Sequence, residues 1–164
     1  MKNLFKISAF GIAVVVCLSV YSFGVKAPAT KYKCMMQMIN YTGEGAYVVI
    51  SLVNPEGKYE KTLYVQGDDS EWYHDITEWW KFYGKKRTSL DGITGETIAG
   101  GERIVSIIEI DDSKLNKGYK IRFETAVEDQ KYHVKDVEFE LTNESVKSKV
   151  DGTGFIRYVR MLPN

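Results

Sequence analysis

The chain has 164 residues, with 22 basic and 22 acidic side chains and a formal net charge of zero. A nucleic-acid-binding protein normally carries a basic excess, so this balance argues against that class and no nucleic-acid partner is expected. Aromatic residues make up 13% of the chain, enough to supply the core of one domain without disulfides.

The N-terminus has the pattern of an export segment. Lys2 and Lys6 precede an uncharged apolar run at positions 7–25. Basic residues followed by such a run are typical of a signal peptide, and the run is also just long enough to span a bilayer as a helix. Residues 1–27 are therefore predicted to be a cleaved signal peptide or a retained anchor helix in the inner membrane, which places the rest of the chain in the periplasm.

The remainder is expected to be a short linker, residues 28–33, followed by one domain, residues 34–164. Within that domain, β-branched and alternating segments recur at short spacing and are separated by turn sequences such as NPEG. About seven strands in such an arrangement predict an all-β fold, an immunoglobulin-like β-sandwich. The expected strands include residues 47–53, 58–65, 103–110, 119–127, 137–141 and 154–162.

One segment, HDITEWWKFYG at residues 74–84, breaks the β pattern because its apolar residues recur at helical spacing. We expect a short helix that packs on the sheet through its aromatic face. Asp75 and Glu78 can form a capping box at its start, and Gly84 can end it. The residues of the apolar face are Ile76, Trp79, Trp80 and Tyr83.

Sulfur ligands and histidines are the candidates for metal chemistry. Cys34, Met36 and Met38 share one face of a strand, where they could bind copper or fill an apolar core, and core packing is favoured because no His accompanies them. His74 and His133 lack a recognisable zinc spacing. No metal site and no catalytic residue are predicted, since no nucleophile and base are paired, and the chain is not expected to be an enzyme.

The segment DGITGET, residues 91–97, lies just before a predicted strand. Gly92 and Gly95 permit positive φ angles, and the side chains of Asp91 and Thr94 can bond to local backbone. With the following AGGER sequence, the segment is expected to be a flexible loop that another enzyme could reach. On composition alone it is an ordinary turn.

The order of residues in this loop resembles the covalent flavin-attachment motif of exported bacterial redox proteins. That motif runs Asp, two variable residues, Ser or Thr, Gly, a small residue, then Thr. By this resemblance a flavin transferase moves FMN from FAD onto Thr97 as a phosphoester, Thr94 and Gly95 shape the loop, and Asp91 anchors it. Glu96 stands where the motif has a small residue.

A longer stretch, from Tyr47 to Leu141, resembles a family of predicted periplasmic bacterial domains of unknown function. The shared features are the paired tryptophans, the flavin-attachment-like loop and the strands around them. Members tend to occur beside PepSY-type haem membrane proteins and flavin transferases. The resemblance implies an immunoglobulin-like sandwich that serves a transmembrane electron-transfer system. Trp72 and Tyr73, just before the expected helix, are the candidates to shield the flavin ring.

Two other functions remain open. In the first, the chain is a cofactor-free β-sandwich module that binds a partner in the envelope, DGITGET is a structural loop and the paired tryptophans belong to the core. In the second, the chain is a soft-metal chaperone that uses the thiol and thioethers of Cys34, Met36 and Met38.

Overall fold

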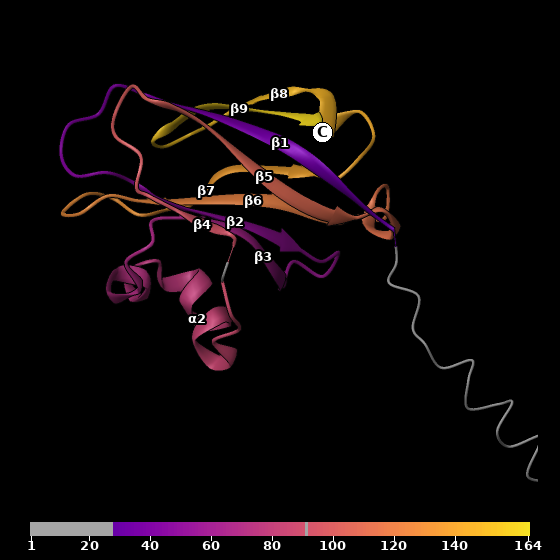
Figure 1. The fold of residues 1–164 in the computed structure, drawn as a ribbon, viewed down its shortest axis with the longest axis horizontal. Helices are drawn as coiled ribbons and strands as arrows, with labels where there is room; N and C mark the ends of the chain where they lie inside the picture. The colour runs from indigo at the N-terminus through magenta and orange to yellow at the C-terminus, as the bar shows by residue number, and fades with distance from the viewer. Residues whose placement is uncertain (1–27, 91) are drawn as a thin grey trace, which may run out of the picture.

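The computed structural model describes residues 28–90 and 92–164, which form two β-sheets and one short α-helix (Figure 1). The predicted signal or anchor, residues 1–27, lies outside the described residues. In the described part of the chain, no helix is long and apolar enough to cross a membrane.

The strands divide into a four-stranded sheet, in the order β5-β1-β9-β8, and a five-stranded sheet, in the order β4-β3-β2-β6-β7. All neighbouring strands are antiparallel except β3 and β4. The strand bounds are β1 Ala29–Met38, β2 Tyr47–Val53, β3 Tyr59–Gln66, β4 Thr94–Gly95, β5 Arg103–Asp111, β6 Lys120–Ala126, β7 His133–Glu140, β8 Lys149–Asp151 and β9 Ile156–Pro163. The helix α2 spans Thr77–Lys86, and short 3₁₀ segments span Ser70–Asp75 (η2), Asp112–Lys114 (η3) and Ser145–Lys147 (η4).

The two sheets are interlocked because the chain crosses between them after β1, β4, β5 and β7. As a result β1 pairs with β5, and β2 pairs with β6, across long stretches of sequence. The prediction of a β-sandwich with one short helix is confirmed. The strands that local pattern did not reveal are the very short β4 and β8.

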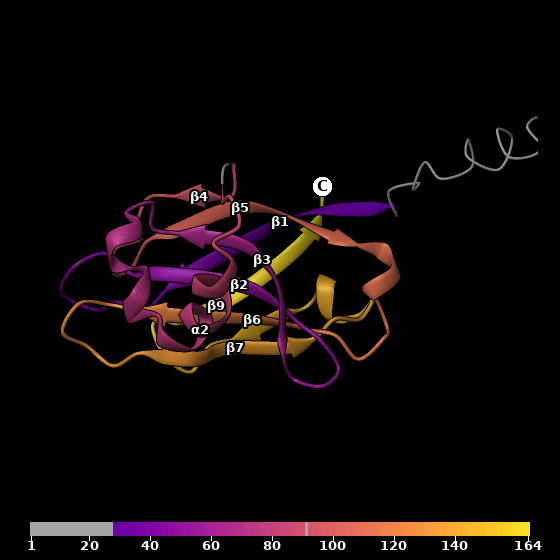
Figure 2. The ribbon, with the colours of Figure 1, turned by 90° about the horizontal axis from the view of Figure 1, so that it is seen from below.

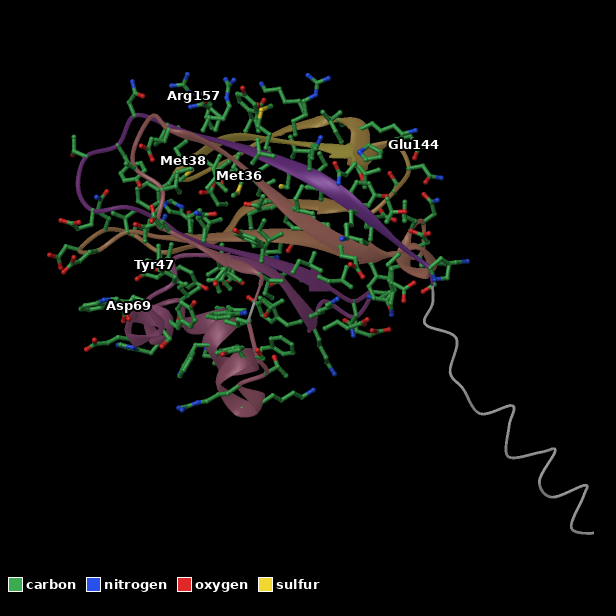
Figure 3. All side chains as sticks on the ribbon, in the orientation of Figure 1. Met36, Met38, Tyr47, Asp69, Glu144 and Arg157 are labelled. Atoms are coloured by element: carbon green, nitrogen blue, oxygen red, sulfur yellow. The ribbon has the colours of Figure 1, made fainter. Side chains whose placement is uncertain are left out.

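The main core lies between the sheets, and the strands supply it through alternate residues. Cys34, Met36 and Met38 are fully buried there, as the core-packing interpretation requires, and Figure 3 shows the two methionines between the layers. Strand β1 already begins at Ala29 and buries Tyr32. The prediction that residues 28–33 form a linker is therefore wrong for residues 29–33, because their backbone pairs with β5.

A second core covers the other face of the five-stranded sheet, where η2 and α2 pack against it (Figures 1 and 2). Trp79 is fully buried at its centre. The Trp79 indole N–H donates to Thr62 Oγ1 at 2.9 Å, and the ring stacks on Tyr83 with 4.6 Å between centroids. The predicted aromatic face of the helix thus makes a third layer of the domain.

The details of the helix ends differ from the prediction. The capping position of α2 is Ile76, which has no side-chain cap, whereas Asp69 caps the preceding η2 through a bond from the Glu71 N–H at 2.9 Å. Gly84 lies inside α2 and does not end it, and an added Cβ there would stand only 3.0 Å from the Trp80 ring. The helix ends at Arg87, which adopts a left-handed conformation with φ of 41°.

Burial of both faces of β6 places charged side chains under the helix layer. Glu124 is fully buried and accepts a hydrogen bond from the Tyr132 hydroxyl, and burial raises the pKa of its carboxyl. Arg122 donates from Nε to Glu138 Oε2 at 2.6 Å. Partial burial opposes ionisation of Glu138, but Arg122 outweighs it and lowers the pKa of that carboxyl.

Replacement of Trp79 by Ala is expected to lower the free energy of unfolding by about 3–5 kcal/mol, because it removes a large buried ring and leaves a cavity. Urea denaturation followed by circular dichroism measures this change. Trp72, whose side chain is 43% exposed, provides the matched control, and Trp72→Ala should cost less than about 1 kcal/mol. Equal losses for the two variants would contradict the assigned packing.

The pKa of Glu124 predicts a specific dependence of stability on pH. A carboxyl with a raised native pKa binds its proton more tightly when folded, so its stabilising contribution is present below the ordinary value of 4.5 and is lost as the pH rises through the native pKa. Glu124→Gln should therefore flatten the fall in unfolding free energy above pH 4.5. Glu138→Gln, at a lowered pKa, should instead remove a loss of stability on acidification below pH 4.5. Unfolding free energies measured by urea denaturation between about pH 3 and pH 8 test both predicted pH dependences. An unchanged slope for Glu124→Gln would refute the prediction for Glu124.

Candidate functional site

A cavity of about 500 Å³ opens at one end of the sandwich, within the size range of small-molecule sites. It lies where the β1–β2 loop, the β6–β7 loop, η2 and the segment before β5 come together. Figure 1 shows these two loops and η2 at the same end of the domain. The end of the sandwich, rather than either sheet face, is therefore the place where a ligand fits.

Thr97 lines this cavity and is exposed. Its side chain lies directly against Gly45, where an added Cβ would stand 2.7 Å from the Cβ of Thr97. The next residue is fixed by a two-way backbone bridge: the Ala46 N–H donates to the Ile98 carbonyl at 2.8 Å, and the Ile98 N–H donates to the Ala46 carbonyl at 3.1 Å. Thr97 is thus held in position with its Oγ1 toward Gly45, while the residue as a whole is exposed.

Two of the residues before Thr97, Thr94 and Gly95, form a short edge strand where the sequence predicts a flexible loop. Thr94 and Gly95 pair in parallel with the end of β3, and Thr94 is half-buried. The Val65 N–H donates to the Ile93 carbonyl at 2.8 Å. These backbone bonds, which sequence composition does not reveal, hold the segment to the sheet.

Two side chains of β3, Tyr64 and Gln66, contact Gly95 and Glu96. An added Cβ at Gly95 would stand 2.8 Å from the Tyr64 hydroxyl oxygen, so a larger residue there would require the Tyr64 side chain to move. The Gln66 side-chain amide donates to the Glu96 carbonyl, while the Glu96 side chain is exposed. Asp91, the predicted anchor of the loop, lies outside the described residues.

The structure separates the two predicted ring-shielding residues. Trp72, in η2, is 43% exposed and lines the cavity. Tyr73 is buried in the second core, where its hydroxyl donates to the Gly67 carbonyl at 2.9 Å. Adjacent residues of η2 point in different directions, so Trp72 can contact a ligand in this cavity and Tyr73 cannot; the prediction for Tyr73 is corrected.

Two aromatic residues that the sequence analysis missed also line the cavity, Tyr47 and Tyr132. Tyr47 begins β2 and bonds through its hydroxyl to the Asp69 carbonyl at 3.4 Å, and Figure 3 shows it on the helix-facing side near Asp69. Tyr132 precedes β7, and burial together with the bonded Glu124 raises the pKa of its phenol. Only the pairing of β2, β6 and β7 brings these rings together, so no local signal could have identified them.

The rim of the cavity is acidic. Carboxylates of Glu44, Asp75, Glu128 and Asp129 line it, and no Lys or Arg does so among the residues that the structure describes. Several carboxylates around one concavity produce a negative potential, which favours neutral or cationic groups over free anions.

The remaining candidates from the sequence do not join this site. His74 is exposed, with Nε2 3.2 Å from Asp75 Oδ1, and His133 packs edge-on against Phe155. Burial raises the pKa of the Cys34 thiol to about 12, which leaves it without a reactive thiolate. Across residues 28–90 and 92–164, no three His, Cys, Asp or Glu side chains gather in a way that could hold a metal ion.

Comparison with known proteins gives one match. No curated protein and no solved structure matches the chain. Residues 29–158 match a family described as a predicted periplasmic protein, which agrees with the family resemblance and with the export predicted from the N-terminus, and the protein is periplasmic. Because this match covers most of its length, the chain belongs to the family "Predicted periplasmic protein (DUF2271)".

Proposed function

We propose that the protein is a periplasmic, non-catalytic carrier of FMN that is attached through its phosphate to Thr97. The observation that carries the proposal is that Thr97 and Trp72 line one cavity of about 500 Å³. The sequence motif identified Thr97, and the exposed aromatic position before the helix identified Trp72. Nothing in either pattern requires the two residues, 25 positions apart, to meet.

The chemistry of the lining residues fits a flavin. An attachment hydroxyl must be accessible to a modifying enzyme, and Thr97 is exposed at the cavity. A planar ring needs flat apolar surfaces, which Trp72, Tyr47 and Tyr132 provide. A bound flavin supplies hydride and single-electron transfer, and the residues of this chain position it and limit its contact with water.

The attachment reaction needs only one group of this chain. The hydroxyl oxygen of Thr97 attacks the phosphorus of the FMN half of FAD and forms the phosphoester bond. The pyrophosphate bond of FAD breaks, AMP leaves, and a base of the flavin transferase takes the hydroxyl proton. The backbone bridge between Ala46 and Ile98 limits how far the acceptor residue can move, because it fixes the residue beside Thr97.

The charges near Thr97 determine two properties of the proposed carrier. Glu96 is exposed beside it, and carboxylates surround the cavity. Negative charge next to a phosphodiester slows its formation, since like charges repel. The same carboxylates lower the reduction potential of an attached flavin, because they destabilise the negative charge that reduction adds.

The family resemblance supplies the proposed partners and the fold relationship. We assign a flavin transferase as the modifying enzyme and a PepSY-type haem membrane protein as the electron-transfer partner, with residues 1–27 as a cleaved signal or an inner-membrane anchor. The pairing of β1 with β5 and of β2 with β6 supports an immunoglobulin-like relationship for the sandwich.

A second function is favoured by the acidic rim. A cofactor-free envelope module could use Glu44, Asp75, Glu128 and Asp129 together with the Trp72 ring to bind a cationic group of a partner. In this case Thr97 stays unmodified even when an active transferase is present.

Intact mass of the exported protein, co-expressed with a flavin transferase, tests the attachment site. Wild type should gain the mass of one FMN-phosphoryl unit and show flavin fluorescence after denaturation. Thr97→Ala should gain nothing, because it lacks the acceptor oxygen. Glu96→Ala should be modified faster than wild type, since it removes the neighbouring charge.

Thr88→Ala is the matched control, because it removes an exposed hydroxyl outside residues 91–97 and leaves the proposed acceptor and its motif in place. It should still be modified. An unmodified wild type, with the transferase shown to act on a control substrate, would overturn the carrier function and leave the cofactor-free module.

Fluorescence of the modified protein tests the role of Trp72. A stacked indole quenches flavin fluorescence by electron transfer, so Trp72→Ala should make the folded, modified protein several-fold brighter. Trp80→Phe, in the helix layer, should leave the brightness unchanged. Equal brightness for Trp72→Ala and wild type would show that the ring does not lie against Trp72.

A further inference from the structure

The four-stranded sheet ends in a long and regular edge strand. Strand β5, Arg103–Asp111, pairs with β1 on one side, and no strand among the described residues pairs with its other side. Its pairing with β1 runs without a register shift. Natural edge strands are usually protected by bulges, prolines or central lysines, and β5 has none of these.

The backbone groups of β5 that point away from β1 can be assigned by alternation. The Met38 N–H donates to the Glu102 carbonyl at 2.9 Å, and the Asp112 N–H donates to the Pro28 carbonyl at 3.0 Å. Even-numbered residues therefore face β1. Because an antiparallel strand alternates, the N–H and C=O groups of the odd-numbered residues point away from the sheet.

Side chains on the outer face extend this edge into an apolar patch. Val105 is 54% exposed and Ile107 is 42% exposed. Met35 of β1 lies opposite Val105, whereas Lys33 lies opposite Ile107 and separates it from Leu162 of β9, which is 44% exposed. Charged residues Arg103 and Glu109 flank the two apolar residues of β5 symmetrically, two positions to either side.

This arrangement is complementary to itself. If two β5 strands pair antiparallel about a two-fold axis at Ser106, Val105 lies opposite Ile107 of the second copy, and Arg103 lies opposite Glu109 of the second copy. Both outer positions then join opposite charges, and both inner positions join apolar side chains. The odd-numbered residues that meet are also those whose backbone groups point outward.

The neighbouring registers are less favourable. An axis at Ile107 would place Val105 opposite Glu109, and an axis at Val105 would place Ile107 opposite Arg103. Each alternative sets an apolar side chain against a charge, twice because of the symmetry. The side-chain pattern therefore selects Ser106 as the centre.

Ser106 itself provides an independent observation. Its side chain is 3% exposed, and its Oγ has no hydrogen-bond partner among the described residues. A buried hydroxyl without a partner is unfavourable. At the two-fold axis Ser106 would face Ser106 of the second copy as a closely spaced pair, in which one hydroxyl can donate to the other.

We infer that β5 pairs with β5 of a second copy of this chain, antiparallel and centred on Ser106, and joins two four-stranded sheets into one continuous sheet. The interface involves the edge of the four-stranded sheet and not the residues that line the Thr97 cavity, so it is independent of flavin attachment. The proposed assembly is a symmetric homodimer.

Sedimentation equilibrium of the purified exported protein over a wide concentration range tests this inference. Wild type should behave as a monomer–dimer equilibrium. Arg103→Glu places like charges opposite each other at both ends of the interface and should weaken dimerisation at least about tenfold. Glu109→Arg should do the same, and the double variant, which restores opposite charges in reversed order, should recover most of the affinity. Arg157→Glu, an equal charge change at an exposed position of β9, should leave the equilibrium unchanged.

Hydrogen exchange supplies a second measurement that does not depend on the charge variants. The amides of Val105 and Ile107 should become more protected as protein concentration rises, whereas the amides of Ile104 and Ile108, which already face β1, should not change. The proposed interface would be overturned if wild type were monomeric at every concentration, or if neither charge reversal weakened the dimer. It would also be overturned if the double variant dimerised no more tightly than the single variants.

Discussion

The domain depends on burial of both faces of the five-stranded sheet. One face meets the other sheet, and the other is covered by the aromatic layer of η2 and α2. Burial of this second face has an energetic cost, because β6 carries Arg122 and Glu124 on the covered side. Glu138 accepts a bond from Arg122 and Tyr132 donates one to Glu124, which offsets part of the cost of burying these polar groups beneath the helix layer.

The same layer creates the cavity. The chain leaves β3 through Gly67, whose φ of 117° brings η2 back over the sheet end, and the Tyr47 ring occupies the space where a side chain at this position would lie. Tyr73 then turns inward against Trp79, with 5.3 Å between ring centroids, and Trp72 turns outward. The exposed ring beside Thr97 is thus a consequence of how the inner ring packs.

Much of the architecture could be predicted from local pattern. The β-branched run at residues 47–53 forms β2 with those bounds, and the helical spacing of the tryptophans marks α2. Alternation shows which residues of β6 share a face, but it cannot show that a helix covers that face, which is why the burial of Glu124 was not foreseen. Strand β4, with two residues, is too short for any period, and Tyr132 joins the cavity only through long-range pairing.

The four edge strands of the two sheets differ in length and in the regularity of their pairing, and this difference distinguishes β5. Two-residue β4 closes one edge of the five-stranded sheet, and β7 at its other edge pairs with β6 through a shifted register. The opposite edge of the four-stranded sheet is β8, which is only three residues long. The turn that follows β8 is bonded to β7 through the buried Asp136 carboxylate. This carboxylate accepts hydrogen bonds from the Gly154 N–H at 2.7 Å and the Ile156 N–H at 3.0 Å. Three edges are therefore short, shifted or tied down. Among the described edge strands, only β5 combines length, regular pairing and an apolar centre. Its outward-facing backbone groups are therefore a specific feature of this edge, and the other sheet edges do not share it.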